Sequence, residues 1–410
     1  MTYTCPGVPP NTASGAAKTP ELLVPAGDLT RLKFAIAYGA DAVYIGGKTL
    51  SMRAKAKNFS REDMAEGVRY AHERGKKVYV AANICAKNAD FGELDDYFFF
   101  LKNINADAVL ISDVGVFSRA QKIGLDVHVS TQANVTNFAA AEFWRDMGAK
   151  RVVLARELSL AEIAEISARV QGIELEVFAH GAMCMAYSGR CLISNFLNSR
   201  DANRGECTQP CRYEYDLIER RSGEILHVSQ NDCGTFIFNS KDLCMAEHVS
   251  ELVAAGVDCL KIEGRMKTEY YVGAVTKIYR AALDDRAADP AQLARELEKI
   301  GNRGYTTGFF FGAPGAIDHD YTGKMQATSQ NFLAVVEGYD AGFALIEQRN
   351  KFSVGDEIEI LRANGENFTQ TVRHMYDTAG NPLETAPHPT QKIRLRVDHP
   401  VAEFDMIRTL

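Results

Sequence analysis

Apolar residues recur between residues 21 and 280 in a repeating unit: a short β-rich run, a polar or glycine turn, and an amphipathic helix pattern. Strands that alternate with helices pair in parallel through right-handed crossovers. The pattern therefore predicts an α/β fold, a closed (β/α)8 TIM-like barrel. Its eight predicted strands are residues 22–25, 42–45, 78–84, 108–112, 127–130, 151–155, 175–179 and 259–262. We assign a ninth run, residues 236–239, to an excursion inside a cysteine-rich insertion.

Helix signals support this unit. The pattern over residues 60–74 opens with Ser60 and has Asp63 three residues later, which is the outline of a capping box. Residues 158–168 and 245–255 also carry apolar positions at helical spacing. Glycines that end a helix pattern shortly before the next strand are expected at positions 75, 124, 148 and 256.

The period changes near residue 323, where short strands separated by turn signals begin. They predict a small C-terminal antiparallel β-barrel domain, with strands at residues 331–339, 343–348, 356–361, 369–376 and 392–397. Between the two domains, a helix (291–300) and an aromatic–glycine stretch (304–312) predict a connector that docks one domain on the other. The expected division is a flexible tail (1–18), the barrel (19–288) with its cysteine-rich region (181–244), the connector (289–322) and the C-terminal domain (323–410).

The composition limits the classes of protein that this chain resembles. Its 410 residues are 46% hydrophobic and 24% charged, which excludes a disordered or fibrous chain. No apolar run approaches the ~20 residues that cross a bilayer, and the N-terminus lacks the features of a secretory signal. We therefore expect a cytoplasmic protein without a membrane partner. The formal charge is −7, so an RNA-binding role would need a basic patch made by folding.

Six of the nine cysteines fall between Cys184 and Cys244, with the spacing C-x6-C-x15-C-x3-C at their start. Zinc sites commonly use two tight pairs, and only Cys207 and Cys211 form one. An iron–sulfur cluster is less restricted to paired spacing, because its inorganic core separates the thiolates. The spacing alone leaves three interpretations open: an iron–sulfur cluster, zinc, or buried and reactive thiols. The remaining cysteines, Cys5, Cys85 and Cys259, are expected to be structural.

The cysteine block begins just past the seventh predicted strand, and chemistry in such barrels gathers at the C-terminal ends of the strands. The positions that follow the predicted strands are Ala26-Gly27, Gly46-Gly47, Asn83, Asp113, Thr131-Gln132-Asn134, Arg156-Glu157, His180-Gly181 and Glu263-Gly264-Arg265. Neither an H-E-x-x-H zinc motif nor a G-x-S-x-G nucleophile elbow is present. The sequence therefore contains neither of these two hydrolase motifs, and no local motif supports a hydrolase.

Five of these strand-end residues are candidate site residues with two interpretations each. His180 is either a general base or ligand, or a hydrogen-bonded structural histidine. Glu263 and Arg265 either bind an anionic substrate, for which arginine is suited, or close the barrel as an ion pair. Gln132 and Asn134 either line a polar pocket or cap the next helix.

Residues 21–27, 39–47, 180–213, 239–244 and 261–267 resemble the collagenase-like peptidase family of the unassigned catalytic class, peptidase family U. The resemblance covers nearly the whole chain from Glu21, and its cysteine block is highly specific. With its appended β-domain, the chain is most similar to the branch of the family that hydroxylates tRNA.

The resemblance implies oxygen-independent hydroxylation of C5 of the wobble uridine to 5-hydroxyuridine, with prephenate as the hydroxyl source and a 4Fe-4S cluster. Carried over by position, the cluster ligands are Cys184, Cys191, Cys207 and Cys244, with Cys211 as an alternate to Cys207. The implied partners are the tRNA anticodon loop, the iron–sulfur assembly machinery and, as an option, a paralogous partner chain.

A mechanistic hypothesis follows from this resemblance. The cluster would lie at the barrel mouth, and a pocket around His180, Glu263 and Arg265 would hold the dicarboxylate or the flipped uracil. Candidate cofactor-binding residues are Gln132, Asn134, Tyr187 and Lys267. The C-terminal domain would grip the RNA, although residues 351–410 carry 7 basic and 9 acidic side chains.

Other functions remain open from the sequence. The first is a peptidase that acts on collagen-like chains, and the second is a partner subunit that carries a cluster for another chain. The third is a hydroxylase for rRNA or for ubiquinone precursors.

Overall fold

The computed structural model describes residues 18–48, 50–51, 57–212, 217–218, 221, 225–226, 240–284, 289–319 and 330–410. Cys5, Cys233, residues 236–239 and the predicted tail, apart from Lys18, lie outside the described residues. Within the described part, no helix is long and apolar enough to cross a membrane.

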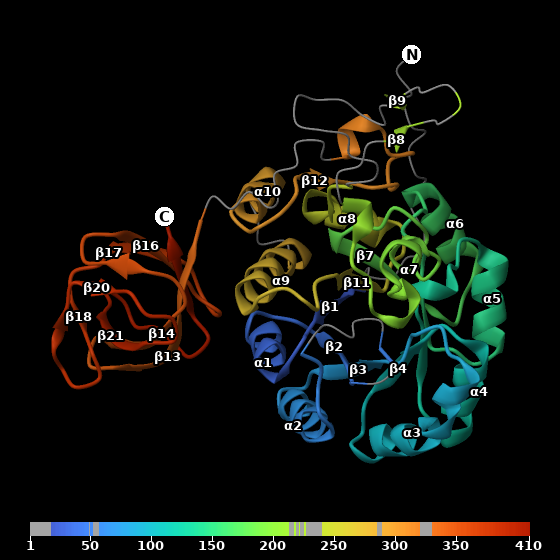
Figure 1. The fold of residues 1–410 in the computed structure, drawn as a ribbon, viewed down its shortest axis with the longest axis horizontal. Helices are drawn as coiled ribbons and strands as arrows, with labels where there is room; N and C mark the ends of the chain where they lie inside the picture. Colours follow the sequence, from blue (N-terminus) through green and yellow to red (C-terminus); the bar gives the residue numbers. More distant parts are fainter. Residues whose placement is uncertain are drawn as a thin grey trace.

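Eight parallel strands form a closed ring, as predicted (Figure 1). They are β1 (Glu21–Pro25), β2 (Ala42–Gly46), β3 (Lys77–Ala81), β4 (Ala108–Ile111), β5 (Val127–Val129), β6 (Arg151–Val153), β7 (Glu174–Ala182) and β11 (Cys259–Ile262). The strands pair in this order, and β11 closes the ring because it pairs in parallel with both β1 and β7. The predicted TIM-like barrel is therefore confirmed.

Helices surround the ring (Figure 1). They are α1 (Leu29–Ala37), α2 (Arg61–His72), α3 (Leu94–Asn103), α4 (Val114–Ile123), α5 (Phe138–Asp146), α6 (Leu160–Arg169), α8 (Val249–Ala254) and α9 (Glu269–Leu283). Helix α2 has the predicted capping box between Ser60 and Asp63. The four predicted helix-ending glycines adopt positive φ angles of 67°, 79°, 92° and 79°. Helix α8 is shorter than the predicted 245–255 because a 3-10 turn, Ala246–His248, takes up its first part.

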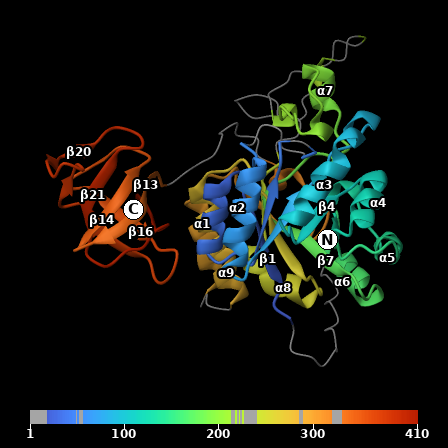
Figure 2. The ribbon, with the colours of Figure 1, turned by 90° about the horizontal axis from the view of Figure 1, so that it is seen from below.

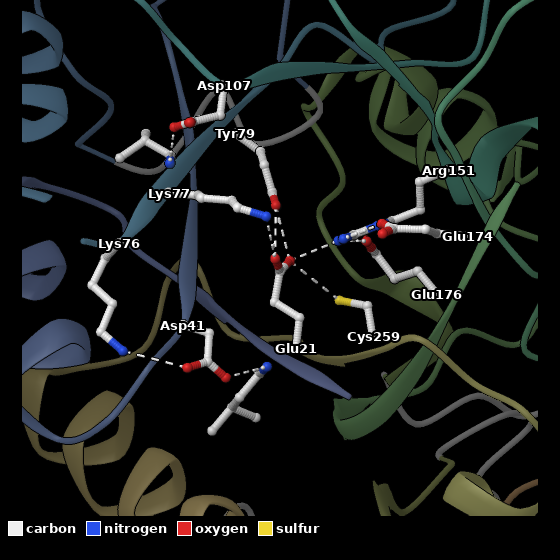
Figure 3. A network of polar contacts seen from close by, with 12 residues as sticks. Glu21, Asp41, Lys76, Lys77, Tyr79, Asp107, Arg151, Glu174, Glu176 and Cys259 are labelled. Atoms are coloured by element: carbon white, nitrogen blue, oxygen red, sulfur yellow. Dashed lines mark hydrogen bonds and ion pairs between the residues drawn. The ribbon is translucent and has the colours of Figure 1, made fainter. Parts of the chain in front are cut away.

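Paired charges fill the interior of the barrel toward the N-terminal ends of its strands (Figure 3). Arg151, only 2% exposed, pairs with Glu21 at 2.8 Å and with Glu176 at 3.2 Å. Lys261 pairs with the other oxygen of Glu176 at 2.7 Å. Burial alone would raise the pKa of Glu176, but the charges of Lys261 and Arg151 outweigh it and lower that pKa to about 2. A buried charge is costly unless it is paired. Since the paired residues come from β1, β6, β7 and β11, the network holds these four strands together.

The end of β7 extends past the ring and acquires two further strands. Strand β10 (Asp242–Cys244) pairs antiparallel with it, and β12 (Tyr305–Thr306) pairs with β10. The cysteine block between β7 and β10 contains α7 (Ile193–Asn198) and the short strands β8 (Leu217–Ile218) and β9 (Ile225–Leu226). Figure 2 shows α7 standing above one end of the ring.

The described part of the predicted connector packs on the barrel. Helix α10 (Pro290–Glu298) contacts α9, and β12 extends the barrel sheet. Phe310 in the aromatic–glycine stretch is 5% exposed, and its carbonyl accepts a hydrogen bond from the Leu160 amide at the start of α6. This stretch therefore covers the barrel, and its predicted role in docking the two domains stays a prediction.

The C-terminal domain is a curled antiparallel sheet around its own apolar core. The strand order is β17 (Phe368–Thr371), β16 (Glu357–Leu361), β22 (Met406–Thr409), β13 (Phe332–Asp340), β14 (Phe343–Gln348), β21 (Lys392–Arg396), β18 (Met375–Tyr376) and β19 (Pro382–Leu383). A separate pair joins β15 (Phe352–Ser353) to β20 (Thr385–Ala386). The predicted strand 369–376 is two strands, β17 and β18, and the final strand β22 was not predicted.

Polar contacts fix this sheet against α1, α9 and α10. The Tyr38 hydroxyl at the end of α1 donates to the carbonyls of Leu361 and Phe404, at 2.8 and 3.0 Å. Arg408 of β22, 1% exposed, pairs with Glu296 of α10 and with Glu359 of β16, each at 2.8 Å. The two domains are therefore joined by a buried ionic contact.

Candidate active site at the barrel mouth

The floor of the barrel mouth is a cation between two aromatic rings. Lys261 lies near the C-terminal end of β11, with its Nζ 4.6 Å from the ring centre of Tyr44 and 5.4 Å from that of Phe178. The Tyr44 hydroxyl donates to the Ile262 carbonyl at 3.0 Å and lies 3.3 Å from a carboxylate oxygen of Glu263. Sequence reasoning missed Lys261, Tyr44 and Phe178. The available signal was their inward-facing position near the ends of their strands.

A hydrogen-bonded group lies at the ends of β3 and β5. The Asn83 amide donates to Ser130 and to Gln132, both at 3.1 Å, and the Ser130 hydroxyl donates to Gln132 at 2.7 Å. Asn134 adopts a left-handed conformation with φ 54° and donates to the Gln132 carbonyl at 2.8 Å. The structure therefore brings Gln132 into a polar network, whereas Asn134 stabilises the turn.

Arg156 follows β6 and faces a narrow crevice. Its guanidinium carbon lies 3.8 Å from the ring centre of Phe178. The crevice is lined by Thr131, Arg156, Glu157, Met183, Cys184, Ala186 and Ser188. Burial raises the pKa of Glu157 above its usual value. Cys184, the first predicted cluster ligand, therefore lies beside charged groups from the end of β6.

His180 does not face the mouth. The register between β7 and β11 shifts after Lys261, so His180 lies opposite Ile262 and packs toward the outer helices. Its ring centre is 5.5–5.9 Å from those of Tyr271, Tyr279 and Tyr305, and it is 1% exposed. Burial, helped by the charge of Lys267, lowers the pKa of His180 to about 3, so the ring is neutral at neutral pH.

Arg265 also lies apart from His180. It is 4% exposed, and its Nη2 donates to the Asn58 side chain at 2.8 Å. Its Nη1 occupies space beside Gly46, where a Cβ would come within 2.4 Å of that nitrogen. The Nζ of Lys267 lies 5.0 Å from the ring centre of Tyr271. The structure therefore places Glu263 at the mouth, Arg265 at the end of β2, and Lys267 near the tyrosines around His180.

The predicted cluster ligands differ in how far they are exposed. Cys184 and Cys207 are exposed, whereas Cys191, Cys211 and Cys244 are partly buried. Cys244 lies opposite His180 in the sheet, and burial raises its pKa to about 11, so its thiol is protonated at neutral pH.

Thiolates are the donors that iron–sulfur clusters use, so the donor set has suitable chemistry. Among the residues that the structure describes, however, no group of three or more His, Cys, Asp or Glu side chains is placed to hold a metal ion. The four-thiolate cluster on these cysteines therefore stays a prediction.

The cysteine block is attached to the loop after β3. Arg204 binds both oxygens of Asp90 at 2.8 Å and donates to the Cys85 carbonyl at 3.0 Å. The Cys85 amide donates to the Asn203 carbonyl at 3.1 Å. The Arg204 hydrogen bonds lower the pKa of Asp90 to about 2. Tyr187 lies on the outer surface of the same block and is 45% exposed.

A cavity of about 800 Å³ opens between the β2–α2 and β3–α3 loops. Its wall includes Ser51, Phe59, Asp90, Tyr97 and Arg204. This volume is within the range of small-molecule sites. The cavity extends from Gly47, just after β2, to Arg204 of the cysteine block.

An arginine–aromatic strip, which we define as Phe343, Tyr376, Arg394 and Arg396, lies on the C-terminal sheet. The two guanidinium carbons are 5.1 and 5.3 Å from the ring centre of Phe343, and the Tyr376 ring is 5.8 Å from it. Both arginines are exposed, and within the described residues no carboxylate lies within 4.0 Å of either. The net acidic domain thus carries a local basic surface beside aromatic rings.

The sequence was compared with those of known protein families. The sequence pattern of Peptidase family U32 matches residues 27–320, and that of the Peptidase family U32 C-terminal domain matches residues 328–408. The chain belongs to peptidase family U32. The predicted family is therefore confirmed.

Relatives of this U32 chain include two that are named for tRNA hydroxylation. It is 40% identical over 401 residues to tRNA hydroxylation protein P1 of Bacillus subtilis, covering 95% of both chains. It is 38% identical to tRNA hydroxylation protein P of Escherichia coli, covering 90% of this chain and 91% of the relative. A protein named collagenase from Porphyromonas gingivalis is 31% identical over 83% of this chain and 86% of its own.

Proposed function

We propose that this U32 chain hydroxylates tRNA at C5 of the wobble uridine and so produces 5-hydroxyuridine. The observation that carries the proposal is the 40% identity to tRNA hydroxylation protein P1 across 95% of both chains. Because the alignment spans the barrel, the cysteine block and the C-terminal sheet, it covers the whole architecture rather than one shared domain.

The proposal extends to an oxygen-independent reaction with prephenate as the hydroxyl source. It also includes a 4Fe-4S cluster on Cys184, Cys191, Cys207 and Cys244, with Cys211 as the alternate to Cys207. The cysteine block at the C-terminal end of the ring supports this location, because barrel enzymes place their chemistry there. Cluster binding would require the Cys244 thiol, whose pKa burial raises to about 11, to lose its proton.

Two surfaces support RNA as the substrate. Bases of a single-stranded loop can leave their stack and bind in a pocket, where amide side chains can read their edges. Asn83 and Gln132 supply such amides at the mouth. On the C-terminal sheet, the arginine–aromatic strip offers cations for phosphates and rings for stacking.

The hydroxylation test uses anaerobically purified protein, prephenate and tRNA that lacks the modification. We expect 5-hydroxyuridine in the digested tRNA by mass spectrometry. Absence of product together with hydrolysis of gelatin would instead favour the peptidase that the collagenase relative represents. Product only after addition of a second chain would favour a partner-subunit role.

The cluster has its own test. Anaerobically purified protein should absorb near ~400 nm and contain iron and sulfide in equal amounts. Cys184→Ser and Cys191→Ser should lose this absorption, whereas Cys5→Ser should retain it. A colourless, iron-free protein with full hydroxylation activity would contradict the cluster.

A further inference from the structure

We propose that the outward face of α7 in the cysteine block binds the anticodon loop of the tRNA. We define the α7 patch as Leu192, Phe196 and Leu197, which Arg190 and Arg200 flank in the chain. This inference rests on the proposed function and deepens it, because it names a surface that holds the RNA at the barrel mouth.

Helix α7 points its apolar side chains toward solvent. Leu192, Phe196 and Leu197 are 52%, 83% and 56% exposed. Leu192 and Phe196 lie one helical turn apart, since the Phe196 amide donates to the Leu192 carbonyl at 3.0 Å. A helix on the surface of a globular protein normally turns its apolar stripe toward the core. Apolar side chains that gather on the outside instead mark a surface for a binding partner.

The inner face of α7 is polar. Ser194 is fully buried, and its hydroxyl oxygen lies 3.1 Å from that of Thr208. The Asn198 amide donates to the same Thr208 oxygen at 2.8 Å. These polar contacts fix α7 on the segment that carries Cys207 and Cys211. The fold therefore holds the apolar side chains of the α7 patch outward.

The charge around the α7 patch favours a nucleic acid. Residues 184–212 contain four arginines and two acidic residues, whereas the whole chain has a formal charge of −7. Arg204 is paired with Asp90, but among the described residues no carboxylate lies within 4.0 Å of the guanidinium of Arg190 or of Arg200. Arginines without carboxylate partners are suited to contact phosphates.

The α7 patch also lies where the target base must arrive. The cysteine block begins at the C-terminal end of β7, and α7 stands above that end of the ring (Figure 2). Leu192 directly follows Cys191, a predicted cluster ligand. When a base leaves its stack, an apolar side chain that packs on the neighbouring bases offsets part of the lost stacking. We therefore expect Phe196 to contact a base next to the wobble uridine.

Binding of a fluorescent anticodon stem-loop RNA to the purified full-length protein tests the inference, by fluorescence anisotropy. Phe196→Ala should raise the Kd for the stem-loop by about fivefold or more, because base–aromatic stacking is lost. Phe196→Tyr should keep the affinity, since its ring can still stack. The matched control is Phe99→Ala on α3, which removes a phenylalanine that is 55% exposed and should leave the Kd unchanged.

The two arginines have their own readout, the dependence of the Kd on salt. Arg190→Gln and Arg200→Gln should each raise the Kd and lower the slope of log Kd against log salt concentration by about 0.7, the value for one phosphate of a single strand. The control is Arg169→Gln, which removes an exposed arginine at the end of α6 and should leave that slope unchanged.

Wild-type affinity for the stem-loop in both Phe196→Ala and Arg190→Gln would overturn the inference. A wild-type dimer that dissociates in Phe196→Ala without a change in RNA binding, measured by sedimentation velocity, would also overturn it and assign the α7 patch to a second copy of the chain. Circular dichroism of each variant controls for folding. Formation of 5-hydroxyuridine by the wild type is assayed in parallel. A wild type that makes this product, with α7 variants of unchanged Kd, contradicts the α7 patch alone, whereas a wild type without product contradicts the proposed function.

Discussion

At the scale of single residues, Gly46 shows how the end of β2 is built around a buried arginine. A Cβ at this position would lie 2.4 Å from Arg265 Nη1 and 2.6 Å from Ser51 Oγ. We expect Gly46→Ala to lower the free energy of unfolding by about 1–3 kcal/mol through overpacking, measured by urea denaturation. Gly92→Ala is the control, because nothing lies within 4 Å of its added Cβ. Equal stability of the two variants would contradict this packing.

Two buried histidines give the stability a pH dependence. Burial lowers the pKa of His128 and of His180 to about 3. In the unfolded chain the two histidines bind protons near pH 6.5, whereas in the folded protein they stay neutral down to about pH 3. The free energy of unfolding therefore decreases as the pH falls from 6.5 toward 3. Between pH 6.5 and pH 5.5 each histidine should lower the free energy of unfolding by about 1 kcal/mol.

Urea unfolding at pH 7.5 and 5.5 measures this loss. His128→Gln should remove the contribution of one histidine. An unchanged pH dependence in His128→Gln would show that this ring is not held neutral.

At the scale of elements, the contact between Arg204 and Asp90 fixes the cysteine block to the loop after β3. We expect Asp90→Asn to speed amide hydrogen exchange in residues 184–212 by roughly tenfold, because a charge-assisted contact is lost. Asp95→Asn, which removes an exposed pair with Arg119, should leave that exchange unchanged. The pKa of Asp90, lowered to about 2, means that the contact persists above pH 4 and is lost as the pH falls toward 2.

The element scale also shows what the sequence could predict. The barrel strands were predictable because each is an apolar run, and because β3, β5, β6 and β11 also follow a predicted helix-ending glycine; both signals are local. The orientation of His180 was not, because it depends on a register shift between β7 and β11, strands separated by the cysteine block. Lys261 was missed for a related reason: its partner Glu176 lies on another strand, so its charge is explained only once the ring closes.

At the scale of the whole molecule, the two domains depend on Arg408. This side chain is 1% exposed and carries the buried contact to Glu296 and Glu359. Arg408→Met should lower the free energy of unfolding by about 3–5 kcal/mol, because it leaves carboxylates unpaired at the interface. Arg394→Met on the exposed face of the same sheet should change it by less than about 0.5 kcal/mol. Similar urea midpoints for the two variants would contradict a buried ionic interface.

The function itself is tested most directly by the nucleosides of tRNA from cells that encode this chain. Mass spectrometry should find 5-hydroxyuridine or its derivatives at the wobble position in wild-type cells, and their loss when the gene is deleted. A plasmid copy should restore them, and a copy with Cys184→Ser should not. Unchanged wobble hydroxylation in the deletion strain, in cells with no second enzyme for this reaction, would contradict the assignment of this U32 chain as a tRNA hydroxylase.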